Sequence, residues 1–182
     1  FDCLVGSEMC IRDRPKAAAK QTIQAMKRGA TPVVLGDYSD RPGDATWILK
    51  ALMDEGVSNM MYAALRDERA LSALSATQAK PGDAFDMSVG GFTGEQAGKP
   101  VRIKGTVKYF GEGWSYDEIA IIEFGDNNLL FLVPTYTQIR TLSPLRIEGL
   151  TPDDYDVFVV KSRVHFRRGF DETGYAKTIM VV

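Results

Sequence analysis

The sequence predicts an α/β protein in which a mixed, mostly parallel sheet is flanked by helices and carries an antiparallel, β-rich insertion. Two observations lead to this fold class. Apolar segments of strand length alternate with helical patterns over residues 15–79 and again after residue 143, and such alternation is typical of parallel sheets with right-handed crossovers. Between them, over about residues 83–136, apolar and polar residues alternate one by one, which predicts antiparallel strands with one exposed face.

Residues 15–182 are predicted to form one domain, because a chain of 182 residues can bury a core without disulfides. Residues 1–14 are interpreted as a non-native or disordered leader. They contain both cysteines, Cys3 and Cys10, and lack the basic start and the cleavage site of a signal peptide. The sequence begins with Phe1 rather than Met, and we expect it to be part of a longer protein.

The first predicted element is a helix over residues 15–28, with Pro15 at its first position and Gly29 past its end. Residues 31–36 follow as a buried strand. A second helix is predicted over residues 47–55, because apolar residues recur with helical spacing from Ala45 to Met53.

A second strand and a third helix come next, over residues 57–65 and 68–79, with Asp67 as the N-cap of that helix. Within the insertion, the Gly-Asp-Asn-Asn segment over residues 125–128 predicts a hairpin turn. A short helix is predicted from Ser143.

The last part of the chain contains a continuous apolar run over residues 156–160, which predicts a strand buried on both faces. A short helix capped by Ser162 is predicted after it. Residues 176–182 are predicted to form the final strand.

Composition excludes two classes of function. The chain has 22 basic and 24 acidic residues in a well-mixed order, so it lacks the basic surface of a nucleic-acid-binding protein. Its longest apolar runs have the length of strands and are too short to span a membrane. Since no cysteine follows Cys10, we expect a soluble, cytoplasmic protein without a disulfide framework.

The loop after residues 31–36 is the first candidate site, because α/β proteins usually hold ligands at the carboxyl ends of their strands. It carries the charged residues Asp37, Asp40, Arg41 and Asp44. The carboxylates suit a divalent metal such as Mg²⁺. In the alternative interpretation, Asp44 caps the following helix, Asp40 pairs with a cation such as Arg41, and Asp37 accepts backbone N–H groups in the turn.

A second polar loop, with Lys161, Ser162, His165 and Arg167, follows the buried strand over residues 156–160. If this strand is the parallel neighbour of residues 31–36, both loops open on one rim of the sheet. A structural histidine beside solvated arginines is the alternative interpretation. His165 is the only histidine in the sequence, so a His-rich zinc site cannot be completed within it.

Four motifs occur in a fixed order along the chain. They are the Asp-Tyr-Ser-Asp-Arg-Pro-Gly-Asp-Ala-Thr loop over residues 37–46, Leu65-Arg66-Asp67, Phe85-Asp86-Met87-Ser88-Val89-Gly90-Gly91, and Lys161-Ser162-x-x-His165-Phe166-x-x-x-Phe170. This order resembles the C-terminal domain of the microcystinase C (MlrC) family, and the resemblance covers nearly all of residues 15–182. Family members commonly carry the longer loop Asp-Asn-Pro-Gly-Gly-Gly-x-Pro-Gly-Asp, where this sequence has Asp40-Arg41-Pro42-Gly43-Asp44.

The resemblance implies a zinc-dependent hydrolase of small peptides or amides, in a family of metallopeptidases known for linearised microcystin. It also implies that His and acidic residues of an N-terminal domain hold the zinc. This chain would then bind no metal itself, and its partner would be that catalytic domain of the same polypeptide. The expected substrate-binding residues line the cleft: Asp37, Asp40, Arg41, Asp44, Lys161, Ser162, His165 and Arg167.

Two other functions stay open at this point. The chain is alternatively a non-catalytic α/β module that binds an anionic small molecule at residues 37–44. It is alternatively a phosphotransferase with Asp37 as nucleophile. Phosphotransferases of that kind resemble Asp-x-Asp, whereas the next carboxylate here, Asp40, lies three residues on.

Overall fold

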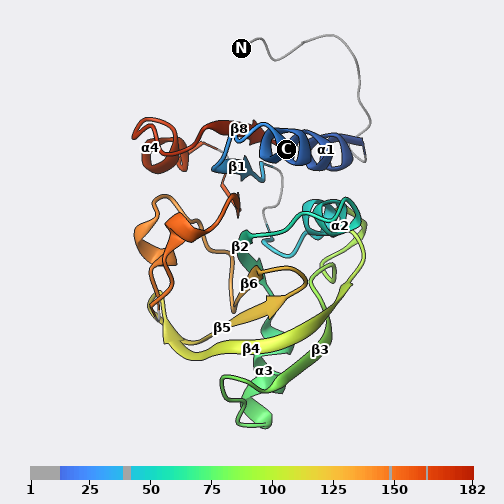
Figure 1. Ribbon diagram of the computed structural model, residues 1–182. Coiled ribbons are helices and arrows are strands. Elements are labelled where there is room, and N and C mark those ends of the chain that lie inside the picture. Colours follow the sequence, from blue (N-terminus) through green and yellow to red (C-terminus); the bar gives the residue numbers. More distant parts are fainter. Residues whose placement is uncertain (1–12, 39–41, 148, 163) are drawn as a thin grey trace.

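The computed structural model describes residues 13–38, 42–147, 149–162 and 164–182. Their strands form one eight-stranded sheet in the order β3-β4-β5-β6-β2-β7-β1-β8 (Figure 1). The predicted leader therefore lies outside the described residues, apart from the last two of its positions. The strands are β1 (Val33–Gly36), β2 (Met60–Arg66), β3 (Ala84–Val89), β4 (Val101–Gly113), β5 (Tyr116–Phe124), β6 (Asn128–Val133), β7 (Val157–Val160) and β8 (Thr178–Val181).

The sheet is mixed, which confirms the predicted fold class. Strands β6, β2, β7, β1 and β8 pair in parallel, and β3, β4, β5 and β6 pair antiparallel. Although β1 and β2 follow each other in the sequence, β7 lies between them. The alternating segment over residues 83–136 continues this same sheet, because its last strand, β6, pairs with β2.

Two strands of the insertion differ from the prediction of an exposed face, because residues 119–122 of β5 and all of β6 are buried. All six residues of β6 are buried, because β6 lies between β5 and β2 and core clusters cover both of its faces. The predicted hairpin turn is confirmed, since β5 and β6 pair antiparallel on either side of it, with Phe124 opposite Asn128.

Helices cover both faces of the sheet. They are α1 (Asp13–Lys27), α2 (Trp47–Asp54), α3 (Glu68–Ala76) and α4 (Arg167–Phe170), with short 3-10 helices η1 (Glu95–Ala97), η2 (Ser143–Leu145) and η3 (Pro152–Asp154). Side chains of α1, α2 and α3 pack with Val33 and Leu35 of β1 in one core cluster. Val34, which points to the opposite face, packs with Phe166 and Phe170 in the other. No helix within the described ranges is long and apolar enough to cross a membrane.

Of the three helix caps predicted from the sequence, the structure confirms one and contradicts two. Asp67 caps α3 as predicted, accepting hydrogen bonds from the backbone N–H groups of Arg69 at 3.1 Å and Ala70 at 3.0 Å. The prediction that Asp44 caps the next helix is wrong, because α2 begins at Trp47 with Thr46 as its N-cap. The prediction that Ser162 caps a helix is also wrong, because α4 begins at Arg167 after an N-cap at Phe166.

Tyr175 packs against aromatic side chains on the face of the sheet that α4 covers. Its ring lies 5.8 Å from that of Phe158 and 6.2 Å from that of Phe170, and its hydroxyl oxygen is buried. Burial raises the pKa of Tyr175 to about 12, and the charge of Asp153 adds to this effect.

We expect Tyr175→Phe to reduce the loss of stability at high pH. In the unfolded chain a tyrosine ionises near its ordinary pKa of about 10, so the folded state loses stability as the pH rises from there towards about 12. Phe cannot ionise, so the free energy of unfolding of the variant should fall less steeply over this range in urea titrations. Identical pH dependence of the two proteins would contradict the assignment.

Candidate functional site

The carboxyl ends of β1 and β7 lie side by side, and the two predicted loops leave the sheet there. The strands pair in parallel with Gly36 opposite Val160, and Asp37 and Lys161 are the next residues along each. The Nζ of Lys161 lies 2.8 Å from Oδ2 of Asp37. Both side chains are enclosed, with exposed fractions of 0% for Lys161 and 6% for Asp37. The structure therefore joins the two loops through a buried ion pair.

Further contacts hold Lys161 in place. Its Nζ donates a second hydrogen bond, of 2.8 Å, to the carbonyl oxygen of Ala45, and it lies 5.3 Å from the centre of the Tyr62 ring. The hydroxyl of Tyr136 donates to the backbone oxygen of Lys161 at 3.0 Å. A buried ammonium group is stable only when such partners replace its water, and here they come from β2 and from the loop after β1.

Gly36 lets residues of the loop after β7 pack against the end of β1. A Cβ built on Gly36 would lie 2.5 Å from Cε1 of Phe166 and 3.1 Å from the backbone oxygen of Ser162. Phe166 is itself fully buried, so its ring has little room to move away. The absence of a side chain at the end of β1 thus lets Ser162 and Phe166 pack directly on the strand.

Asp44 is a buried anchor for a loop that lies far from it in the sequence. Its Oδ2 accepts the backbone N–H groups of Phe92 at 2.8 Å and Thr93 at 2.9 Å, and its Oδ1 accepts the Thr93 hydroxyl at 2.5 Å. The backbone oxygen of Asp44 accepts the N–H of Gly91 at 2.7 Å. This arrangement explains why Asp44 does not cap α2.

Asp67 holds the same loop from the other side. While its Oδ1 caps α3, its Oδ2 accepts the N–H of Gly90 at 2.8 Å. Gly90 has a φ of +63°, and a Cβ there would lie 2.8 Å from the Asp44 backbone oxygen, so this position requires glycine. No local sequence pattern signals this contact, because residues 23 positions apart form it.

The other described residues predicted for the site differ in their exposure. His165 and Arg167 are exposed, and Arg167 pairs with Asp171 at 2.8 Å. Ser162 is buried, and its Oγ accepts the N–H of Phe166 at 3.3 Å. Asp40 and Arg41 lie outside the described residues. The structure therefore brings Asp37 and Lys161 into contact, places Asp44 in a separate buried cluster and leaves His165 at the surface.

Metal ligands do not come together in this part of the protein. Within the described ranges, no group of three or more His, Cys, Asp or Glu side chains is arranged to hold a metal ion. The carboxylates of Asp37 and Asp44 already accept hydrogen bonds from Lys161 and from residues 92–93. These residues do not fit a zinc site, and no chemical step through a metal is assigned to them.

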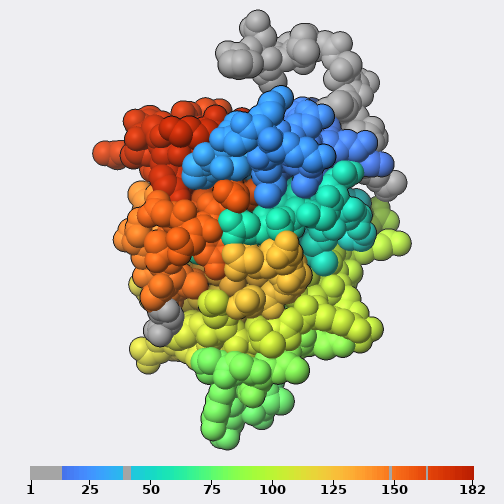
Figure 2. Space-filling view, in the orientation of Figure 1, coloured from blue at the N-terminus to red at the C-terminus, as the bar shows by residue number. Residues whose placement is uncertain are grey.

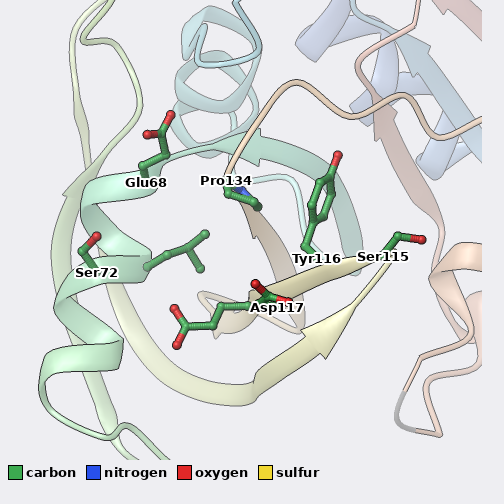
Figure 3. A pocket seen from close by; sticks show the side chains of 8 residues that line it. Glu68, Ser72, Ser115, Tyr116, Asp117 and Pro134 are labelled. Atoms are coloured by element: carbon green, nitrogen blue, oxygen red, sulfur yellow. The ribbon is translucent and has the colours of Figure 1, made fainter.

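A polar hollow of about 690 Å³ lies further along the same rim, between α3 and the start of β5 (Figure 3). Glu68, Asp117 and Glu118 contribute carboxylates to its lining. Glu68 already pairs with Arg66 at 2.7 Å, and Glu118 accepts the hydroxyl of Ser75 at 2.8 Å. We therefore assign no ligand to this hollow.

We expect Lys161→Met and Asp37→Asn each to lower the free energy of unfolding by about 3 kcal/mol, because each leaves a buried group without its partner. The free energy of unfolding of the double variant should also fall, but by less than the sum of the two single losses. The difference should be at least about 1 kcal/mol, since the partners interact directly. Urea unfolding measures all three. Lys108→Met, which breaks an exposed pair with Glu123, should cost under about 1 kcal/mol. Additive effects of the two buried substitutions would contradict the pairing.

Comparisons with known proteins agree with this architecture. The crystal structure of a candidate metallopeptidase from Mesorhizobium sp. BNC1 is similar, with a TM-score of 0.73 and 17% sequence identity. The similarity covers 90% of this chain and 35% of that chain, so this chain spans about a third of the length of that protein. At this identity the likeness shows a shared fold.

The remaining comparisons concern sequence. No curated protein matches the chain. The family model described as the MlrC C-terminus matches residues 35–182, which include the last two residues of β1, both loops of the rim and all later strands. This chain therefore belongs to the MlrC C-terminal family.

Proposed function

We propose that this chain is the C-terminal part of a zinc-dependent amide or peptide hydrolase and forms one wall of its substrate cleft. Residues outside this chain would hold the zinc. Family membership and the fold shared with a candidate metallopeptidase support a peptidase-like protein. The structural observation that carries the proposal is the junction of the two family-like loops at one rim, through Lys161 and Asp37.

The proposal gives different roles to the buried and the exposed residues. Because Lys161 and Asp37 are enclosed, they act as positioning residues that fix both loops. His165 and Arg167 are exposed on the second loop and are proposed to donate hydrogen bonds to a substrate carboxylate or to the oxyanion of the transition state. Asp40 and Arg41 are proposed to contact substrate from the first loop, while Asp44 and Ser162 support the loops.

Zinc, when bound by the rest of the enzyme, would polarise the scissile carbonyl group and lower the pKa of a bound water. The residues of this chain would orient the substrate towards it and exclude bulk water. A nucleophilic Asp37 is disfavoured by its burial and its ion pair.

Metal removal tests this proposal. We expect a chelator to abolish amide hydrolysis by the full-length protein that contains this chain, and stoichiometric zinc to restore it. The 182-residue chain alone should retain no stoichiometric zinc by elemental analysis. Hydrolysis that survives the chelator, or zinc retained by this chain, would refute the proposed division of the enzyme.

Substitution of His165 tests the substrate-facing role. In the full-length protein, His165→Ala should lower kcat/KM by about tenfold or more, as expected when a donor to the transition state is lost. Lys177→Ala, an exposed residue before β8, is the control and should change kcat/KM less than about twofold. A loss below about threefold for His165→Ala would remove His165 from the site.

A further inference from the structure

A groove of about 630 Å³ runs along α2, opposite the segment that leads into β4. Atoms of α2 and of the β3–β4 region adjoin on the molecular surface (Figure 2). The volume is in the range of small-ligand sites. Its apolar lining consists of Trp47 and Met53 from α2 with Pro100 and Val101 from the other side. None of these residues belongs to the rim described above.

The indole of Trp47 is fixed in this groove. Its Nε1 donates a hydrogen bond of 2.9 Å to the backbone oxygen of Gln96. A Cβ built on Gly98 would lie 3.2 Å from Cε2 of the indole and 2.7 Å from Oγ1 of Thr46, and Gly98 has a φ of +80°. The glycine thus lets the loop pack closely on the ring, which provides a rigid apolar wall.

The charges around the groove favour an anion. Lys50, Lys99 and Arg102 line it together with one carboxylate, that of Asp54. Lys50 pairs with Asp54, and Arg102 pairs with Asp86 at 2.7 Å. Among the ion pairs of the described residues none includes Lys99, which is exposed. The ammonium group of Lys99 therefore remains available to a ligand.

One end of the groove adjoins the rim. Thr46 lines the groove, and its hydroxyl donates to the backbone oxygen of Lys99 at 2.7 Å. The residue before it, Ala45, receives the hydrogen bond from Lys161. A ligand in the groove would therefore lie next to the segment that the buried ion pair holds.

We propose that this groove binds the C-terminal residue of a short peptide, with its apolar side chain against Trp47 and Met53 and its α-carboxylate at Lys99. The peptide nature of the ligand rests on the proposed function. An apolar wall beside one available cation matches an apolar residue that ends in a carboxylate, since burial of the side chain and a charge-assisted hydrogen bond then act together.

The fluorescence of Trp47 measures this binding, in a Trp114→Phe background that removes the second tryptophan. If the Trp114→Phe variant does not fold, calorimetry on the unaltered chain measures the same affinity. The probes are the tripeptide Ala-Phe-Leu with a free carboxylate, the same peptide with a C-terminal amide, and octanoate. We expect the free acid to bind saturably and the amide to bind about tenfold more weakly.

Lys99→Ala should weaken binding of the free acid by about tenfold and leave that of the amide unchanged. Lys80→Ala, which removes an exposed lysine elsewhere, should change neither by more than about twofold. Equal affinity for acid and amide, or an unaffected Lys99→Ala, would overturn the carboxylate site. Octanoate binding as tightly as the peptide would overturn the peptide assignment. These experiments measure binding and not hydrolysis. If the full-length protein hydrolysed no amide but this chain still bound the peptide, the result would contradict the proposed function and leave the proposed groove site standing.

Discussion

The ammonium group of Lys161 and the carboxylate of Asp37 are 124 positions apart in the sequence and 2.8 Å apart in the fold. Removing both groups from water costs several kcal/mol, which only close pairing and further hydrogen bonds can offset. The carbonyl oxygen of Ala45 and the face of Tyr62 provide those further partners. The pair therefore requires that β1, β2 and β7 all be in place, and it couples the geometry of the rim to that of the sheet.

A second set of buried carboxylates organises the neighbouring loop by a different principle. Asp44 and Asp67 accept backbone N–H groups of residues 90–93 instead of pairing with a buried cation. Each such charge-assisted bond satisfies a donor that a glycine-containing turn leaves free. As a result the β3–β4 connection is tied to the loops after β1 and β2. The same connection, through Gly98 and Lys99, forms one side of the groove along α2.

This arrangement fits the proposal that the chain, which spans about a third of the length of a structurally similar protein, forms one part of a larger site. The rim has a rigid base of buried charges and a surface of exposed polar groups, including His165. Under the proposed function, the exposed groups would donate hydrogen bonds to substrate while the buried pair holds their loops in place. The groove lies beside the rim and has apolar lining residues, so the two proposed binding surfaces would contact different parts of one ligand.

Local patterns in the sequence determined the alternating strands and helices, the hairpin after β5, the Asp67 cap and the family, because these depend on neighbouring residues. They also placed Asp37 and Lys161 at strand ends. Tertiary structure decided the insertion of β7 between β1 and β2, the burial of β6 and the enclosure of Lys161. It also assigned Asp44 to residues 92–93 rather than to the helix that follows it. Each of these features depends on contacts between segments that are distant in the chain. Hydrophobic spacing and capping preferences describe one segment at a time, so they do not indicate which distant segment it will contact.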